Sequence, residues 1–374
     1  MKILWHEKKW LNYFILVLVG SGLIAFLARN DAFLYRQPIM RISQVKNSQS
    51  VRTTDEYGNH DQQTEQRLTG KVLNGKYRGE TFTLKNTFTE SHGEDQQFRS
   101  GQDIFLNLYH NKQGQKPTAA FANYKRDVYL FLLIWLMLCS LLLVMRLRGL
   151  KAISSVLINF ILFLALVKLD IVWNITNFFW IYAAGAVLFT ALSLLIVIGW
   201  NEQSRVTFAA VITGTATALG LAVLIMWLTH DSGMHYEALD FATQQPKQLF
   251  LASTLIGLLG TVMDAATDIV STVFELKRSQ PEIGFKQLFT SGRQVGRSIM
   301  GPLINVLLLI FFTETFTLAI LYFRTGNNIS YTFQWTMSLG LVQAIISGIG
   351  ITLVIPVASF LAAWRLEWKQ HDNT

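Results

Sequence analysis

Long blocks of apolar residues dominate the hydropathy pattern of the chain. Each block approaches or exceeds the ~20 residues that a helix needs to cross the hydrocarbon core of a bilayer. Eight such blocks occur, at residues 11–28, 128–145, 152–168, 178–199, 206–228, 248–270, 299–323 and 335–363. The pattern therefore predicts an all-α polytopic membrane bundle of about eight transmembrane helices.

A different pattern occupies residues 29–127, which are polar, rich in Gln, Asn, Thr and Gly, and free of any spanning block. Apolar and polar residues alternate around Phe82 and Leu84, as they do in a half-buried strand. The upstream Asn74–Gly75 pair predicts a hairpin turn, and residues 101–110 also have strand character. We expect a small β-rich domain here, barrel-like or sandwich-like.

The chain is thus predicted to have three parts: an N-terminal transmembrane helix at 1–28, a β-rich domain at 29–127, and a seven-helix membrane domain at 128–374. The first apolar block follows three lysines, which is also the pattern of a cleaved signal peptide. An uncleaved helix is the favoured interpretation, because the block is long and "ARNDAF" after it has no small-x-small cleavage site.

Composition and charge agree with a membrane protein. Only 15% of the residues are charged and 51% are hydrophobic, whereas soluble domains carry about 25% charged residues. The net charge is +8, but the basic residues cluster at the ends of apolar blocks, where they set orientation in the membrane. We therefore expect the lipid bilayer as partner and no nucleic acid.

The distribution of basic residues predicts the orientation. With a cytoplasmic N-terminus, fourteen basic residues lie on the cytoplasmic side and three in the short outer loops. The cytoplasmic side then holds Lys2, Lys8, Lys9, Arg146, Arg148, Lys151, Arg205, Lys277, Arg278, Lys286, Arg293, Arg297, Arg365 and Lys369. We predict that both termini are cytoplasmic and that residues 29–127 are extracytoplasmic.

The sixth predicted span carries acidic residues. Asp264, Asp268 and Glu275 are four and seven residues apart, so they share one face of a helix. Asp264 lies ~24 Å along a helix that starts near Gln248, at ~1.5 Å per residue. This distance predicts that Asp264 lies in the cytoplasmic third of the membrane and Asp268 near its inner boundary.

A membrane carboxylate usually faces the interior of the bundle or a watery cavity, and is often paired. Arg293 and Arg297, four residues apart on one face, are the candidate counter-ions. Two interpretations stay open. In the structural one, Asp264 pairs with either arginine and locks two helix ends together. In the functional one, Asp264 and Asp268 bind a cation or carry a proton.

Small residues accompany these arginines. Gly292 and Gly296 are four residues apart, as expected where helices approach closely. We expect 285–298 to form a short amphipathic interfacial or re-entrant helix before the next span. Pro302 is then expected in the first turn of that span, with Asn305 about one turn deeper as part of the polar site.

Two segments of the chain resemble the signature of the YibE/F-like family of bacterial membrane proteins: "GLLGTVMDAATDIVSTVFEL" and "FKQLFTSGRQVGRSIMGPLINVLLL". The resemblance extends over roughly residues 65–323 and is most specific at 260–305. The matching positions are Gly260, Met263, Asp264, Glu275, Ser291, Gly292, Gly296, Arg297, Met300, Gly301 and Asn305. We regard Gly301 as a third close-packing glycine.

The resemblance implies a protein of the bacterial cytoplasmic membrane, of the longer family type with an extracytoplasmic domain. It also implies a shorter paralogous membrane protein as a partner, with a homo-oligomer as the other possibility. It implies no particular biochemical activity.

The sequence indicates no enzyme. An intramembrane aspartyl protease needs carboxylates on facing helices, whereas both Asp264 and Asp268 lie on one, and no histidine lies within a span. There is no phosphate-binding glycine loop. The histidines and carboxylates of the 229–240 loop are interpreted as a solvated loop and not as a metal site, and the single Cys139 excludes an intrachain disulfide. We expect no cofactor.

The sequence thus favours a permease-like component that moves an ion or a small solute. The alternative is a membrane scaffold or sensor that assembles with a paralogue and binds a ligand through its outer domain.

Overall fold

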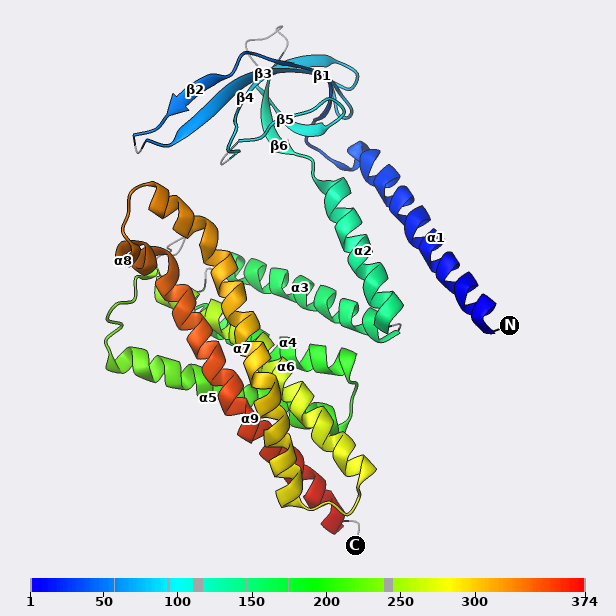
Figure 1. The fold of residues 1–374 in the computed structure, drawn as a ribbon, viewed down its shortest axis with the longest axis vertical. Helices are drawn as coiled ribbons and strands as arrows, with labels where there is room; N and C mark the ends of the chain where they lie inside the picture. The colour runs from blue at the N-terminus through cyan, green and yellow to red at the C-terminus, as the bar shows by residue number, and fades with distance from the viewer. Residues whose placement is uncertain are drawn as a thin grey trace. The chain divides into compact units, whose positions relative to one another are not determined.

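The computed structural model describes residues 2–56, 58–92, 95–109, 117–145, 147–173, 175, 177–238 and 245–372. The chain divides into two compact units, Met1–Arg146 and Leu147–Thr374, and each is described by itself (Figure 1). In the described residues, seven helices are long and apolar enough to cross a membrane. They are α2 (Asp127–Met145), α3 (Leu147–Trp173), α4 (Phe179–Val197), α5 (Glu202–Leu228), α6 (Pro246–Ser279), α7 (Phe285–Arg324) and α9 (Ser338–Asp372, with its span beginning at Ile329).

The first apolar block is also helical. Helix α1 runs from Lys2 to Arg29, but its apolar part, Ile15–Arg29, is shorter than those seven helices. An eighth span therefore stays a prediction.

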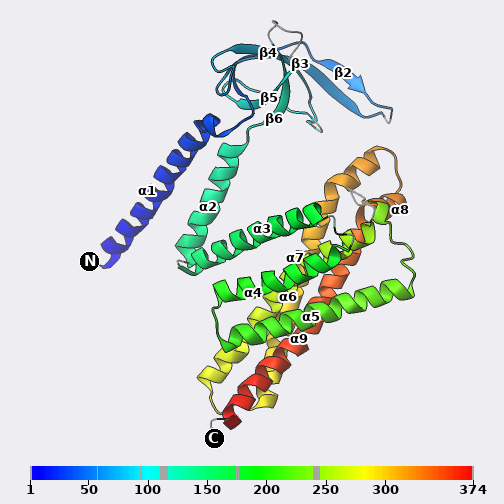
Figure 2. The same ribbon diagram turned by 180° about the vertical axis from the view of Figure 1, so that it is seen from behind.

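The β-rich domain of the first unit is a curled antiparallel sheet of six strands. They are β1 (Ile39–Asn47), β2 (Val51–Thr54), β3 (His60–Val72), β4 (Thr81–Thr89), β5 (Asp103–Tyr109) and β6 (Thr118–Tyr124). The strand order is β2-β3-β1-β5-β6, with β4 on the other side of β3. The outer strands β4 and β6 approach each other, so the sheet forms a partly open barrel (Figure 2).

The alternating pattern predicted the strands but not the turn. Phe82 and Leu84 point into the barrel core, and β3 pairs with β4 in continuous register. Asn74 and Gly75, however, do not form a two-residue hairpin, because β3 ends at Val72 and β4 begins only at Thr81. The buried Asn74 amide instead binds the chain that leads into β1: its Oδ1 accepts from the Ile39 N–H at 2.7 Å.

A buried charge cluster joins the β-rich domain to both of its helices. Lys125 Nζ lies 2.7 Å from Asp31 Oδ1 and 2.9 Å from Asp127 Oδ2, and donates to the Ala28 carbonyl at 2.6 Å. The Tyr35 hydroxyl donates to Asp127 at 2.5 Å. Burial disfavours the charged form of Lys125, but the two carboxylates outweigh this effect and raise its pKa. The cluster therefore fixes the end of α1 beside the start of α2.

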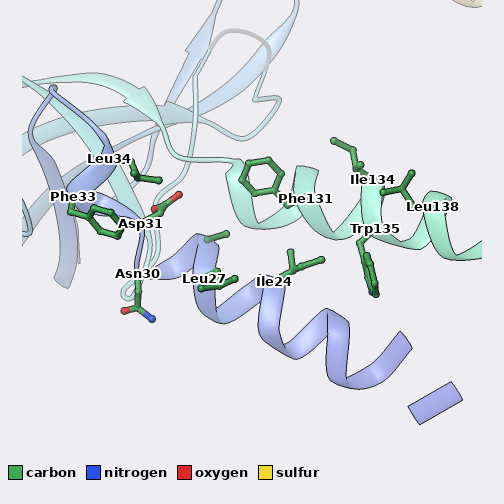
Figure 3. A pocket seen from close by; sticks show the side chains of 11 residues that line it. Ile24, Leu27, Asn30, Asp31, Phe33, Leu34, Phe131, Ile134, Trp135 and Leu138 are labelled. Carbon is green, nitrogen blue, oxygen red and sulfur yellow. The ribbon is translucent and has the colours of Figure 1, made fainter. Parts of the chain in front are cut away.

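Below this cluster, an apolar crevice separates α1 from α2 (Figure 3). Leu27 of α1 faces Phe131 of α2 across it, and the short helix η1 (Ala32–Leu34) borders one end. The two helices touch again where Trp135 lies on Gly20, since a Cβ at Gly20 would come within 2.8 Å of Trp135 Cε2. Helices α1 and α2 are therefore held together at the Lys125 cluster and at the contact of Trp135 with Gly20. The crevice between the two helices has a volume of about 640 Å³.

The second unit is a helical bundle centred on α6. Helices α4, α5, α7 and α9 all contact it, and in Figures 1 and 2 α7 and α9 lie alongside each other. Three short elements complete the unit: η2 (Tyr236–Ala238), α8 (Ile329–Thr332) and a π-helical turn η3 (Phe333–Met337) that leads into α9.

The predicted short helix at 285–298 does not exist as a separate element. Helix α7 is continuous over 40 residues and contains Pro302 well inside it, not in a first turn. A proline removes only one helical hydrogen bond, and neighbouring helices tolerate such an interruption inside membranes. Here the Thr352 hydroxyl of α9 contacts Met300 Sδ at 3.7 Å, close to the interruption.

Candidate functional site on helix α6

One face of α6 forms the core of the bundle. Its buried residues follow the spacing of a helical stripe, three and four apart. They include Leu255, Leu258, Val262, Ala265, Ala266, Ile269, Val270 and Val273. Most are small or branched, so the neighbouring helices approach closely: a Cβ at Gly214 of α5 or Gly350 of α9 would come within about 3.3 Å of Val262.

The opposite face of α6 is small and polar. Every residue on it is exposed, and together they form what we call the α6 polar stripe: Ser253, Gly257, Gly260, Asp264, Asp268, Thr272 and Glu275. At ~1.5 Å per residue the stripe is ~33 Å long, which is the thickness of a bilayer core. The prediction that the three acids share a face agrees with this arrangement.

Asp264 and Asp268 are not enclosed by the other helices of the second unit. Asp264 and Asp268 are exposed, and among the described residues neither side chain forms a hydrogen bond or an ion pair. The structural interpretation required a lock between Asp264 and Arg293 or Arg297, and the described residues contain no such pair. Glu275 differs, because Arg278 pairs with it at 3.1 Å.

The two candidate counter-ions nevertheless lie at the depth of the carboxylates. Gly292 of α7 packs against Val273 of α6, since a Cβ there would lie 2.9 Å from Val273 Cγ2. The helices run antiparallel from that contact, so Arg297 is level with Asp268 to within about one turn. Arg293 and Arg297 are both exposed, and the Arg293 guanidinium lies over the Phe289 ring at 5.6 Å. All four charges are therefore available to another group.

Two of the three candidate glycines lie at close helix contacts. A Cβ at Gly292 would lie 2.7 Å from Ser359 Oγ, and one at Gly296 would lie 2.8 Å from Ile355 Cγ1, both on α9. Gly301 does not belong with them, because a Cβ there would meet no atom within 4 Å.

Asn305 is separate from the other polar residues. Its side chain is exposed on α7, two turns beyond Arg297, and forms no hydrogen bond in the described residues. The structure therefore does not bring Asn305 into contact with Asp264.

The sequence pattern missed a mainly apolar pocket beside the stripe, with a polar contact in its wall. Asn159 of α3 donates to the Ser193 hydroxyl of α4 at 2.6 Å, and the Asn159 Oδ1 atom is buried without a hydrogen-bond partner. Gly260 and Met263 of α6 border the same pocket, whose volume is about 250 Å³. The available signal was a lone asparagine in an apolar block, which points to a buried polar contact.

The loop between α5 and α6 is held by internal ion pairs. Asp231 pairs with Lys247 at 2.6 Å and accepts from the Tyr236 hydroxyl at 3.2 Å, while His235 lies 3.2 Å from Glu237. Asp240 lies outside the described residues. In the described part of this loop, no three His, Cys, Asp or Glu side chains gather as a metal would require.

Comparisons with known proteins cover nearly the whole chain. The model of the YibE/F-like protein family matches residues 133–368, and that of the YibE/F family N-terminal domain matches residues 33–124. No curated protein and no solved structure matches the chain. The boundary between the two matches falls close to the start of α2, where the β-rich domain ends.

Proposed function

The chain belongs to the YibE/F-like family, and from the geometry of α6 we propose that it is a permease-like component that moves an ion or a small solute across the cytoplasmic membrane. The cargo travels along the α6 polar stripe. We further propose that both termini are cytoplasmic and that the β-rich domain is extracytoplasmic, as the distribution of basic residues indicates. The function involves no covalent chemistry.

The observation that carries this proposal is the pair of unpaired carboxylates on a continuous polar stripe. A carboxylate within a membrane costs roughly 2.5–3.5 kcal/mol or more, and such residues mark ion pathways and proton relays. Asp264 and Asp268 have no partner in the described residues, so their charge is free to attract a cation or take up a proton. Ser253 and Thr272 add hydroxyl oxygens at either end of the stripe.

The stripe is open on one side within the second unit, and a second membrane subunit would complete a path. We propose that this subunit is either another copy or a shorter paralogue of the family. The small residues Gly257 and Gly260 allow a partner helix to approach closely.

The test is cation flux in proteoliposomes that contain the purified full-length protein. The probes are protons, followed with an internal pH dye, and Na⁺ and K⁺ under imposed gradients. We expect Asp264→Asn to lower the flux at least tenfold while assembly stays native. The matched control is Glu282→Gln, which removes an exposed acid outside the α6 polar stripe; it is expected to leave the flux unchanged.

Two results would refute transport of a cation: no flux of any probe through the native protein, or native flux through Asp264→Asn. A variant that loses assembly would instead favour a scaffold or sensor. The specific observation behind this second candidate is the same uncovered face, which a partner helix would cover. Disulfide trapping through Ser253→Cys, in a Cys139→Ser background, tests that contact directly.

A further inference from the structure

A polar cavity of about 550 Å³ lies in the β-rich domain beside the connection from β4 to β5. It is distinct from the α6 polar stripe and has a different chemistry. Arg99 and Arg126 line it together with the Gln102 amide, the Tyr124 hydroxyl and the His92 ring. These side chains are mainly hydrogen-bond donors, and two of them carry permanent positive charge.

No acid among the described residues pairs with the arginines of the cavity. Arg99 and Arg126 are exposed, and in the described residues neither forms an ion pair. Asp95 is the acid among the described lining residues: its Oδ2 accepts from the Thr89 N–H at 2.8 Å and from the Thr89 hydroxyl at 2.7 Å, while its Oδ1 is buried without a hydrogen bond. It also lies 3.5 Å from His92 Nδ1.

A third guanidinium lies close to the cavity. Arg29, the last residue of α1, places its Nη2 atom 3.9 Å from the position of a Cβ on Gly101. Gly101 precedes Gln102, which lines the cavity, and its φ of 88° forms the turn there. Arg29 also forms no ion pair with a described residue, so three arginines without a described acidic partner lie near one short loop.

The walls of the cavity are held in place by hydrogen bonds. Gln102 accepts from the Arg99 N–H at 2.7 Å and donates to the Tyr124 hydroxyl at 3.2 Å. The buried Gln66 amide binds both backbone groups of Phe98, at 3.0 and 3.1 Å. Because these bonds already order the loop, an anion would lose little affinity to ordering it.

The cavity also lies where a membrane surface is expected. Arg126 immediately precedes α2, whose apolar residues begin at Val128. A cluster of arginines at this height matches the phosphate groups of a lipid leaflet, which guanidinium groups bind bidentately. We propose that the cavity is a phosphate-binding site, occupied either by the headgroup of an anionic phospholipid or by a soluble phosphate compound.

The proposal is tested with the full-length protein in a neutral detergent. The probes are dioctanoyl phosphatidylglycerol, dioctanoyl phosphatidylcholine with the same chains, and inorganic phosphate, with affinities measured from thermal-shift titrations. We expect phosphatidylglycerol to bind at least tenfold more tightly than phosphatidylcholine. The Arg99→Gln/Arg126→Gln variant is expected to lose this preference, whereas Arg52→Gln, an exposed arginine of β2 outside the cavity, is expected to keep it.

The arms of the experiment distinguish the two sources of phosphate. Competition by inorganic phosphate indicates a soluble ligand, whereas phosphatidylglycerol binding without competition indicates a lipid headgroup. The proposal is overturned if neither phosphatidylglycerol nor inorganic phosphate binds. It is also overturned if Arg52→Gln weakens binding as much as the double variant. If the double variant does not fold, the single variants Arg99→Gln and Arg126→Gln are compared with Arg52→Gln in its place. Each single variant is expected to lose part of the affinity for phosphatidylglycerol.

Discussion

Replacement of Gly296 by alanine tests whether the contact between α7 and α9 sets the stability of the bundle. A Cβ at this position would lie 2.8 Å from Cγ1 of Ile355 and 3.1 Å from its Cβ. Carbon atoms prefer separations of ~3.5–4.0 Å. Ile355 is only 6% exposed and is stiff because it branches at Cβ. The two helices must therefore move apart to admit the methyl group.

The size of the effect follows from two opposing contributions. Overpacking of a well-packed core costs roughly 1–3 kcal/mol, whereas alanine favours a helix over glycine by ~1 kcal/mol in water. Gly348→Ala in α9 is the matched control, because a Cβ at Gly348 meets no atom within 4 Å. It gains the same helical preference without the clash. The difference between the two variants is thus ~1–3 kcal/mol, or roughly 5- to 150-fold in the unfolding equilibrium.

The assay is reversible unfolding of the purified protein in mixed micelles, followed by circular dichroism as the fraction of denaturing detergent rises. We expect Gly296→Ala to unfold at a lower fraction than Gly348→Ala. Equal midpoints for the two variants would show that Ile355 yields without cost, and the close-packing interpretation of Gly296 would then be wrong.

Three further predictions concern the β-rich domain. Lys125→Met should lower the stability of this domain by about 3–5 kcal/mol in thermal unfolding, because Asp31 and Asp127 lose their buried partner; an unchanged midpoint would contradict the buried ion pairs. The raised pKa of Lys125 means that its contribution is complete below the unfolded lysine pKa of about 10.4. It is lost as the pH rises further, so the melting temperature of the native protein should fall more steeply above that pH than that of Lys125→Met. Gln66→Leu leaves the buried backbone N–H and C=O of Phe98 without hydrogen bonds, at a cost of roughly 1–3 kcal/mol each. Hydrogen exchange at the Phe98 amide should therefore become faster. Unchanged exchange would contradict the hydrogen bonds between Gln66 and Phe98.

Much of the fold could be predicted from local patterns. The apolar blocks located the seven helices that are long and apolar enough to cross a membrane, since a chain in lipid must satisfy its backbone hydrogen bonds within each segment. Alternation around Phe82 and Leu84 located β4, because a strand places successive side chains on opposite faces. Both signals are local, because the length of an apolar block and the alternation along a strand can be read without knowing which other segments pack against them.

The errors arose where tertiary contacts decide. Asn74–Gly75 has the composition of a tight hairpin, but its amide is used to bind the start of β1. Pro302 is typical of a helix start, but here it lies inside the continuous helix α7. The spacing of Asp264 and Asp268 placed them correctly on one face, but no periodicity shows which face the neighbouring helices cover.

The register of α6 against α7 separates the roles of the two aspartates. Val273 of α6 is level with Gly292 of α7, and the two helices run antiparallel. Asp264, nine residues before Val273, is therefore level with Gly301, nine residues after Gly292 and inside the apolar run of α7. Asp268 is level with Arg297, outside that run and among basic residues. We therefore expect Asp264 to bear most of the cost of residing in a membrane, because Asp268 has the Arg297 guanidinium at its level. Transport should then depend more strongly on Asp264: we expect Asp268→Asn to lower proton or Na⁺ flux no more than threefold, against at least tenfold for Asp264→Asn. Equal losses in the two variants would place both carboxylates at the same depth and contradict the register.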